Sequence, residues 1–199
     1  MQFATTIGAL CLAYACAVPA QATPHIPADG AQVIERLPAR NDPLQRELRR
    51  LRAALAASPG DPQLAADLAR RYIAAARTDG DPRYLGYAQA VLAPWRDRPQ
   101  APLQLRVLRA TILQSMHQFP AALAELDAVL RADRNNAQAW LTRATILQVQ
   151  GDYPQAKSSC AKLYALAPEL VSVACVAGVA ALNGQAAQGY ALLSAVLRR

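Results

Sequence analysis

The chain has 199 residues, of which 53% are hydrophobic and 18% are charged. This composition excludes an intrinsically disordered tail and is sufficient for the buried core of one domain or of a small array of repeats. The formal net charge of +7 comes almost wholly from arginine, and the arginines are dispersed among acidic residues. Such dispersion is typical of a solvated surface, so nucleic-acid binding through the arginines is the less favoured alternative and no nucleic-acid partner is expected.

The first 22 residues differ from the rest of the chain. They contain no charged side chain, include an apolar stretch from Ile7 to Val18, and end in Ala20-Gln21-Ala22. This pattern predicts a cleaved signal peptide over residues 1–22, and hence a periplasmic or secreted protein with no membrane span after cleavage. An uncleaved signal that anchors the protein in the inner membrane is the alternative. Residues 23–42 are predicted to be a proline-rich linker.

Helix start signals recur after the linker. Asp42-Pro43, Asp61-Pro62 and Asp81-Pro82 each place an N-cap acceptor before a proline at the first helical position. A lone helix is expected over 43–57, and Pro94 is expected to kink or end its helix near Ala93. No segment alternates apolar and polar residues over a sufficient length for a strand, so we expect about nine helices and no sheet.

An internal repeat occupies the second half of the chain. The hexamer RATILQ occurs at 109–114 and again at 143–148, and the offset between the two copies also relates Phe119 to Tyr153 and Pro120 to Pro154. This spacing is typical of a helix-turn-helix unit that stacks on its own copy, because one helix pair cannot bury its apolar face alone.

Segment 137–170 carries large and small residues, a turn glycine, an aromatic residue and a terminal proline in a fixed order. In sequence they are Trp140, Ala144, Leu147, Gly151, Tyr153, Ala156, Leu163 and Pro168. This order resembles the tetratricopeptide repeat (TPR). Unit 103–136 matches nearly as well, with His117 in place of the turn glycine, and units 62–102 and 171–199 match if the turn is longer or shorter. The resemblance covers residues 43–199 and implies an all-α, TPR-like right-handed solenoid of antiparallel helix pairs.

The resemblance also implies a concave groove lined by the first helix of each pair, where members of the family commonly hold an extended peptide or a partner helix. The positions expected to face it are Arg70, Gln104, Val107, Thr111, Gln114, Gln138, Leu141, Thr145 and Gln148. Arg70 is the only cation expected there. Two Gln-Thr-Gln ladders would offer amide donors and acceptors to a peptide backbone, or they are neutral polar residues retained after a duplication. The implied function is a scaffold or adaptor with a protein or peptide ligand, in bacterial envelope assembly or secretion.

The last helix suggests an alternative from another functional class. Apolar residues cover more than one of its faces, namely Tyr190, Leu192, Leu193, Val196 and Leu197. A terminal helix of a repeat array usually has a polar outer side, so a covering partner is expected. The chain could therefore be a structural module that self-associates through its apolar ends.

After signal cleavage, Cys160 and Cys175 are the only cysteines. The resemblance places them on the second helix of one unit and the first helix of the next, which stack together. They form a disulfide in an oxidising compartment, or they are two small buried free thiols.

The sequence contains no pattern that predicts catalysis. No serine or cysteine nucleophile has a plausible neighbouring base, no glycine-rich phosphate loop is present, and metal-type spacing of cysteine or histidine is absent. We therefore expect no enzyme activity, no cofactor and no metal. His117 is interpreted as a turn residue, since histidine tolerates a left-handed backbone better than most residues. The aromatic group Tyr72, Tyr84, Tyr87 and Trp95 is either core packing or a binding patch.

Overall fold

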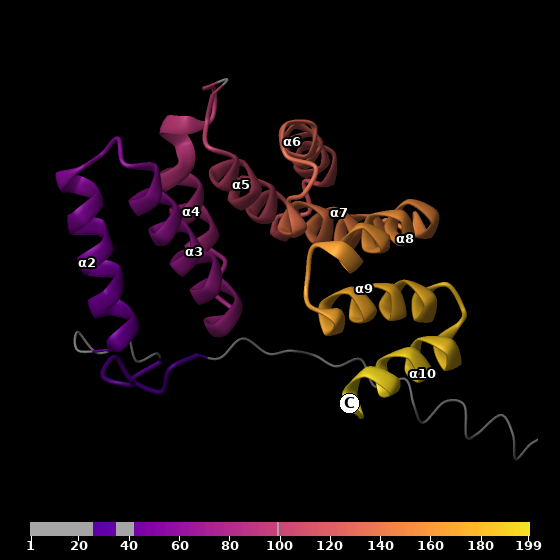
Figure 1. Cartoon of the computed structure of the whole chain (residues 1–199). Coiled ribbons are helices and arrows are strands. Elements are labelled where there is room, and N and C mark those ends of the chain that lie inside the picture. Colours follow the sequence, from indigo (N-terminus) through magenta and orange to yellow (C-terminus); the bar gives the residue numbers. More distant parts are fainter. Residues whose placement is uncertain (1–25, 35–41, 99) are drawn as a thin grey trace, which may run out of the picture. The chain divides into compact units, whose positions relative to one another are not determined.

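The computed structural model describes residues 26–34, 42–98 and 100–199 (Figure 1). The chain divides into two compact units, Met1–Ala39 and Arg40–Arg199. In the first unit, the described residues 26–34 are exposed and form a turn in which the Gln32 N–H donates to the Asp29 carbonyl at 3.3 Å. The predicted signal peptide and much of the predicted linker lie outside the described residues.

The described part of the second unit contains nine α-helices and no strand, which confirms the all-α prediction. The helices are α2 (Pro43–Ala57), α3 (Pro62–Asp79), α4 (Arg83–Leu92), α5 (Leu103–Ser115), α6 (Phe119–Ala132), α7 (Ala137–Val149), α8 (Tyr153–Lys162), α9 (Glu169–Leu182) and α10 (Ala186–Leu197). Two short 3-10 segments, η1 (Ala93–Trp95) and η2 (Leu163–Ala165), extend α4 and α8.

Aspartate caps set the starts of α2 and α3, as predicted. The Asp42 carboxylate accepts from the Leu44 N–H at 3.3 Å, and the Asp61 carboxylate accepts from the Gln63 N–H at 2.7 Å. At Asp81 the prediction was wrong by one residue, because α4 begins at Arg83 with Pro82 as its cap. The Asp81 carboxylate accepts from both the backbone and the guanidinium of Arg83, and these hydrogen bonds hold its pKa below the usual range.

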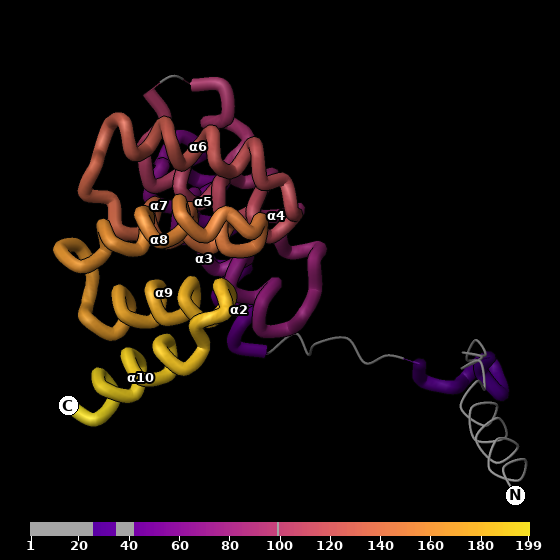
Figure 2. Tube along the Cα trace, turned by 90° about the vertical axis from the view of Figure 1, so that its right-hand side faces the viewer, coloured from indigo at the N-terminus to yellow at the C-terminus, as the bar shows by residue number. Residues whose placement is uncertain are grey.

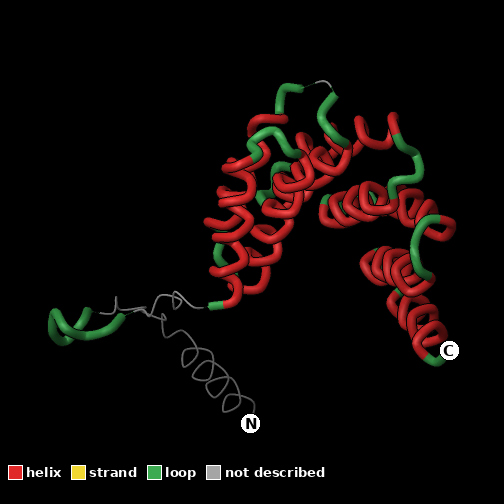
Figure 3. The backbone as a smooth tube through the Cα atoms, turned by 60° about the vertical axis from the view of Figure 1, so that its left-hand side comes forward, coloured by secondary structure: helices red, strands yellow, loops and turns green. Residues whose placement is uncertain are grey.

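The helices of the second unit form a succession of hairpins (Figure 2). The pairs are α3 with α4, α5 with α6, α7 with α8, and α9 with α10, and α2 packs against α3. The first helices contact one another in the order α3, α5, α7 and α9, and each second helix contacts the first helix of the next pair. Figure 3 shows the same arrangement as rows of helices joined by short loops. The first helices therefore share one face, which is the face expected to carry the groove.

Small residues occupy equivalent places where the second helices cross the first. Ala88, Ala122 and Ala156 follow one another at the spacing of the two RATILQ copies, and all three are fully buried. Gly189 takes the corresponding place in the last hairpin, and a Cβ atom built there would lie 2.6 Å from the carbonyl oxygen of Ala177. The backbones of α9 and α10 approach so closely at this place that only glycine fits.

The turns within the hairpins are equally regular. Gly151 and Gly184 have φ angles of 77° and 78°, and His117 takes the corresponding place with a φ of 58°. His117 is therefore a turn residue in the left-handed region, as predicted.

Pro94 ends α4 at Leu92, close to the predicted place, and the chain continues as η1. The Trp95 side chain is only 4% exposed and packs in the core with Leu92, Ala101 and Leu105. The break at Pro94 thus places Trp95 between the hairpin of α3 and α4 and the hairpin of α5 and α6.

Candidate binding groove

A pocket of about 440 Å³ opens on the face shared by the first helices. It is bounded by α3, by α5, and by the start of α7. The structure brings together here five of the nine predicted groove residues, namely Arg70, Gln104, Val107, Thr111 and Gln138. The lining also includes the apolar side chains of Ile73 and Val107, both of which are buried.

A chain of polar side chains connects α3 to α5 at one edge of the pocket. Arg70 Nη2 donates to the Gln104 Oε1 at 3.3 Å, and Gln104 Nε2 donates to the Gln63 Oε1 at 3.3 Å. The same Arg70 guanidinium forms an ion pair with Asp67 at 2.5 Å. Part of the positive charge of Arg70 is therefore neutralised within α3, and Gln104 is held by two long hydrogen bonds of the kind that are easily exchanged.

The two predicted groove threonines offer less hydrogen-bonding capacity than the sequence suggested. The Thr111 hydroxyl donates to the Val107 carbonyl at 3.0 Å, and the Thr145 hydroxyl donates to the Leu141 carbonyl at 3.0 Å. Both protons are engaged by the carbonyl four residues earlier in the same helix. Each hydroxyl can still accept a hydrogen bond from a ligand.

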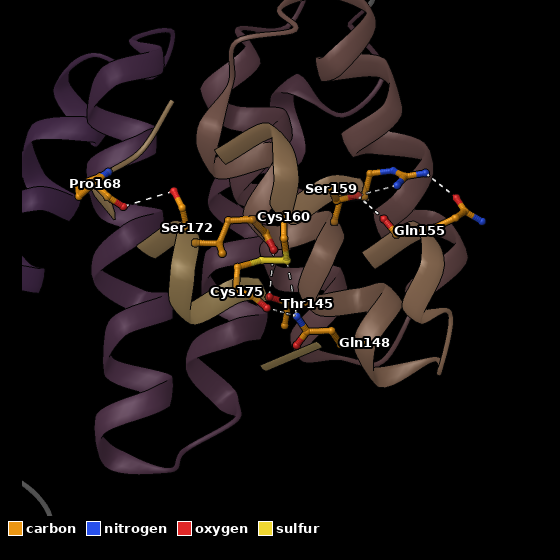
Figure 4. The surroundings of a disulfide bond; sticks show 10 residues. Thr145, Gln148, Gln155, Ser159, Cys160, Pro168, Ser172 and Cys175 are labelled. Atoms are coloured by element: carbon orange, nitrogen blue, oxygen red, sulfur yellow. Dashed lines mark hydrogen bonds between the residues drawn. A yellow bond between two sulfur atoms is a disulfide. The ribbon is translucent and has the colours of Figure 1, made fainter. Parts of the chain in front are cut away.

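Four predicted groove residues do not line this pocket: Gln114, Leu141, Thr145 and Gln148. The Gln148 amide instead donates across the repeat boundary to the Cys175 carbonyl in α9 at 3.5 Å (Figure 4). Leu141 packs against the buried cluster that contains Ala144, Cys160 and Cys175. The carboxyl end of the second Gln-Thr-Gln ladder, at Gln148, thus faces the next hairpin. Gln114, at the corresponding place on α5, is half-buried.

Cys160 of α8 and Cys175 of α9 are joined by a disulfide, with their Cα atoms 5.5 Å apart (Figure 4). Both side chains are buried, at 0% and 7% exposure. The bond closes a loop of 15 residues that includes η2 and the turn before α9. It therefore fixes the boundary between two successive hairpins covalently.

Three of the four aromatic residues singled out in the sequence gather at a second pocket of about 550 Å³. The ring centroids of Tyr72, Tyr84 and Tyr87 lie 5.6 to 6.1 Å apart. The Tyr72 hydroxyl accepts from Arg52 Nε at 2.6 Å, and Tyr87 remains 51% exposed. Trp95 lies in the core instead, so the four aromatic residues do not form one patch.

Sequence reasoning missed two polar residues that line the first-helix pocket. Arg77 belongs to the last turn of α3, so Arg70 is not the only cation at the pocket. Asn136 is the N-cap of α7, and its side-chain oxygen accepts from the Ala139 N–H at 3.0 Å. The position of Asn136 directly before the first helical residue was the signal that could have identified it.

The described residues also bear on metal binding and membrane insertion. Within residues 26–34, 42–98 and 100–199, no group of three or more His, Cys, Asp or Glu side chains is placed to hold a metal ion. None of the helices in these segments combines the length and the apolar character needed to cross a bilayer.

The stacked hairpins, the small residues at their crossings and the left-handed turn positions together define a TPR-like fold. No protein-family model matches the sequence, and no curated protein matches it significantly. Solved structures do match. A thermophilic TPR protein of Thermus thermophilus is 17% identical, with a TM-score of 0.66 over 78% of this chain and 82% of that one.

MamA structures are also similar to this chain. MamA from Desulfovibrio magneticus RS-1 is 14% identical, with a TM-score of 0.57 over 80% of this chain and 86% of that one. Another MamA structure is 12% identical, with a TM-score of 0.54 over 78% of this chain and 81% of that one. These likenesses show the all-α, TPR-like solenoid that the sequence predicted.

Proposed function

We propose that this chain is a non-catalytic protein-interaction scaffold that holds an extended peptide or a helix of a partner protein against its first helices. The observation that supports the proposal is the pocket of about 440 Å³ between α3, α5 and α7. Stacked helix pairs of this class use the surface lined by their first helices for binding.

The chemistry of the pocket suits a polypeptide ligand. Its lining includes Val107 and Ile73, which can contact an apolar side chain, and the amides of Gln104, Gln138 and Asn136. An amide both donates and accepts hydrogen bonds, so it matches the N–H and C=O groups of a peptide backbone. The hydrogen bonds that now hold Gln104 are 3.3 Å long, and exchanging them for bonds to a peptide costs little.

Site-specific photo-crosslinking in living cells tests the groove. A photoreactive residue at Thr111 is expected to capture a partner, whereas one at Ala124, which is exposed on α6, is not. The substitution Ala74→Trp fills the pocket, because Ala74 lines it, and should abolish capture from Thr111. Ala124→Trp is the matched control and should leave capture intact. Capture from Thr111 that survives Ala74→Trp would reject this site.

We further propose that the protein is exported and acts in the assembly or secretion machinery of a bacterial envelope. Support comes from the sequence of residues 1–22 and from the disulfide between Cys160 and Cys175, a bond that persists in oxidising compartments. Mass spectrometry of the periplasmic fraction is expected to find a mature protein that begins at Thr23. An intact Met1 in the membrane fraction would favour the anchored alternative.

A second candidate function is self-association through the carboxyl-terminal hairpin. The observation in its favour is the exposure of large apolar side chains there, with Tyr190 at 76%, Leu197 at 66% and Leu182 at 56%. Light scattering on the mature protein distinguishes the candidates, because a concentration-independent monomer rejects self-association and leaves the groove proposal untouched. Tyr190→Ser should restore a monomer if this hairpin forms the contact.

A further inference from the structure

A strongly basic pocket lies outside the groove, between α6, α7 and α8. Its volume is about 570 Å³, and its walls carry four cationic side chains, from Arg131, Arg134, Arg143 and Lys162. Asp127 is the one carboxylate among the described residues that line it. Arg131, Arg134 and Lys162 are exposed, and within the described segments no ion pair joins any of the three to a carboxylate. We call this site the basic pocket.

Arg143 lines the basic pocket and is held by three hydrogen bonds. Its Nη1 donates to Ser159 Oγ at 2.9 Å, its Nη2 donates to Gln155 Oε1 at 3.1 Å, and its Nε donates to Asp127 at 3.3 Å. A guanidinium has five N–H donors, so two remain for a ligand. Because the side chain is already ordered, it loses little conformational entropy when an anion binds.

The preceding repeat provides an internal comparison. Arg109 holds the same position of the RATILQ hexamer one repeat before Arg143, but its guanidinium forms an ion pair with Glu125 at 2.5 Å and is 9% exposed. Ser159 takes the place of Glu125 in the next repeat, and Lys162 takes the place of Ala128. The second copy has therefore lost an internal carboxylate and gained a cation.

The replacement of Glu125 by Ser159 and of Ala128 by Lys162 indicates that the ligand of the basic pocket is an anion. A site that is neutralised by its own glutamate in one repeat lacks that carboxylate in the next, where Asp127 at 3.3 Å is the one carboxylate among four cations, so the described lining keeps an excess of positive charge that an anionic ligand would balance. Arginine pairs with carboxylates through two parallel hydrogen bonds, and Trp140 beside it adds an aromatic surface. The Trp140 ring is fixed by its own N–H, which donates to the Arg134 carbonyl at 2.8 Å.

We propose that the basic pocket binds an acidic stretch of a protein partner, with a glutamate or aspartate carboxylate seated on Arg143. The cations are gathered in one pocket and do not form a track along the row of helices, so they suit a short acidic peptide better than a nucleic-acid backbone. The site shares no lining residue with the groove, so it adds a second contact surface that is independent of the groove.

Fluorescence anisotropy with a fluorescein-labelled hexaglutamate peptide tests the proposal. The wild-type chain is expected to bind the peptide at low salt and to release it as salt rises. Arg131→Glu should weaken binding by about tenfold or more, because a nearby attraction becomes a repulsion. Arg198→Glu changes the net charge equally at an exposed position outside the pocket and should have an effect of about twofold or less.

Ser159→Glu is the sharper variant. It restores the arrangement of the preceding repeat, in which a glutamate neutralises the arginine, and should abolish hexaglutamate binding while Ser159→Gln retains it. Circular dichroism checks that both variants fold. Since Ser159 is buried, the exposed Arg131 variant keeps the test decisive if Ser159→Glu fails to fold.

Four results would overturn the proposal: no binding at low salt, equal weakening by Arg131→Glu and Arg198→Glu, tighter binding of oligothymidylate or tripolyphosphate than of hexaglutamate, or loss of hexaglutamate binding in the groove variant Ala74→Trp. In the last case the peptide would occupy the groove.

Discussion

Replacing Gly189 with alanine tests how closely the last two helices pack. The added Cβ would lie 2.6 Å from the carbonyl oxygen of Ala177 and 3.4 Å from its carbonyl carbon. Both are backbone atoms of α9, so no side chain can rotate away to relieve the contact. The α10 helix must move outward, and its contacts with α9 must loosen along the length of the hairpin.

Two effects of opposite sign determine the magnitude. Alanine stabilises a helix interior by about 1 kcal/mol relative to glycine. Overpacking of a close-packed contact costs about 1–3 kcal/mol. The net expectation for Gly189→Ala is a loss of up to about 2 kcal/mol in the free energy of unfolding. In a domain of this size each kcal/mol corresponds to about 2–4 °C in Tm.

Gly86→Ala is the matched control, because Gly86 also lies within a helix but a Cβ there meets nothing within 4 Å. That variant should be stabilised by about 0.5–1 kcal/mol. Urea denaturation followed by circular dichroism measures both variants, and the difference between them isolates the steric cost. Hydrogen exchange should increase in α9 and α10 of Gly189→Ala only. If the two variants are equally stable, the close approach of α9 and α10 is wrong.

Three further predictions concern stability and can be checked by urea denaturation. Glu125→Gln should cost about 3 kcal/mol, because it leaves the buried Arg109 guanidinium without its carboxylate, whereas Asp127→Asn should cost less than about 1 kcal/mol since Asp127 is 49% exposed. Equal costs would mean that the buried ion pair of Glu125 with Arg109 stabilises the fold no more than the exposed pair of Asp127 with Arg143. Removing the disulfide by Cys160→Ala should cost about 3 kcal/mol on a loop-entropy estimate for 15 residues, and reduction of the wild type should reproduce that loss. His117→Gly should be at least as stable as the wild type, while His117→Val should lose about 1–2 kcal/mol because its φ of 58° is unfavourable for a β-branched residue; a stable valine variant would contradict the left-handed turn.

The sequence was sufficient to predict the fold because local signals and the repeat agreed. Asp42 and Asp61 cap helices where a proline follows, and His117 stands where the next repeat has Gly151. Each of these residues acts within its own helix or turn, so its role depends on spacing along the chain alone. Asp81 is the exception, since its carboxylate is occupied by the neighbouring Arg83.

Side-chain contacts between the two helices of a hairpin could not be predicted in the same way. The pairing of Arg109 with Glu125 joins α5 to α6, and the repeat offset assigns Ser159 to the place of Glu125 without showing that Arg143 then bonds to it. Which side chain meets which depends on how far each helix is rotated and how its neighbour crosses it. Periodicity fixes the buried face of a helix, but it leaves these two quantities free.

The same reason explains why only five of the nine residues predicted for the groove line the pocket. Gln104 and Gln138 occupy equivalent places near the amino ends of α5 and α7, and both line the pocket. Gln148 lies near the carboxyl end of α7, on the same face by helical periodicity, but its amide bonds to the α9 backbone. Each first helix must contact the first helix of the next hairpin somewhere along its length, and that contact occupies part of the face that periodicity assigns to the groove. The amides of Gln104 and Gln138 therefore line the pocket, whereas the amide of Gln148 joins two successive repeats.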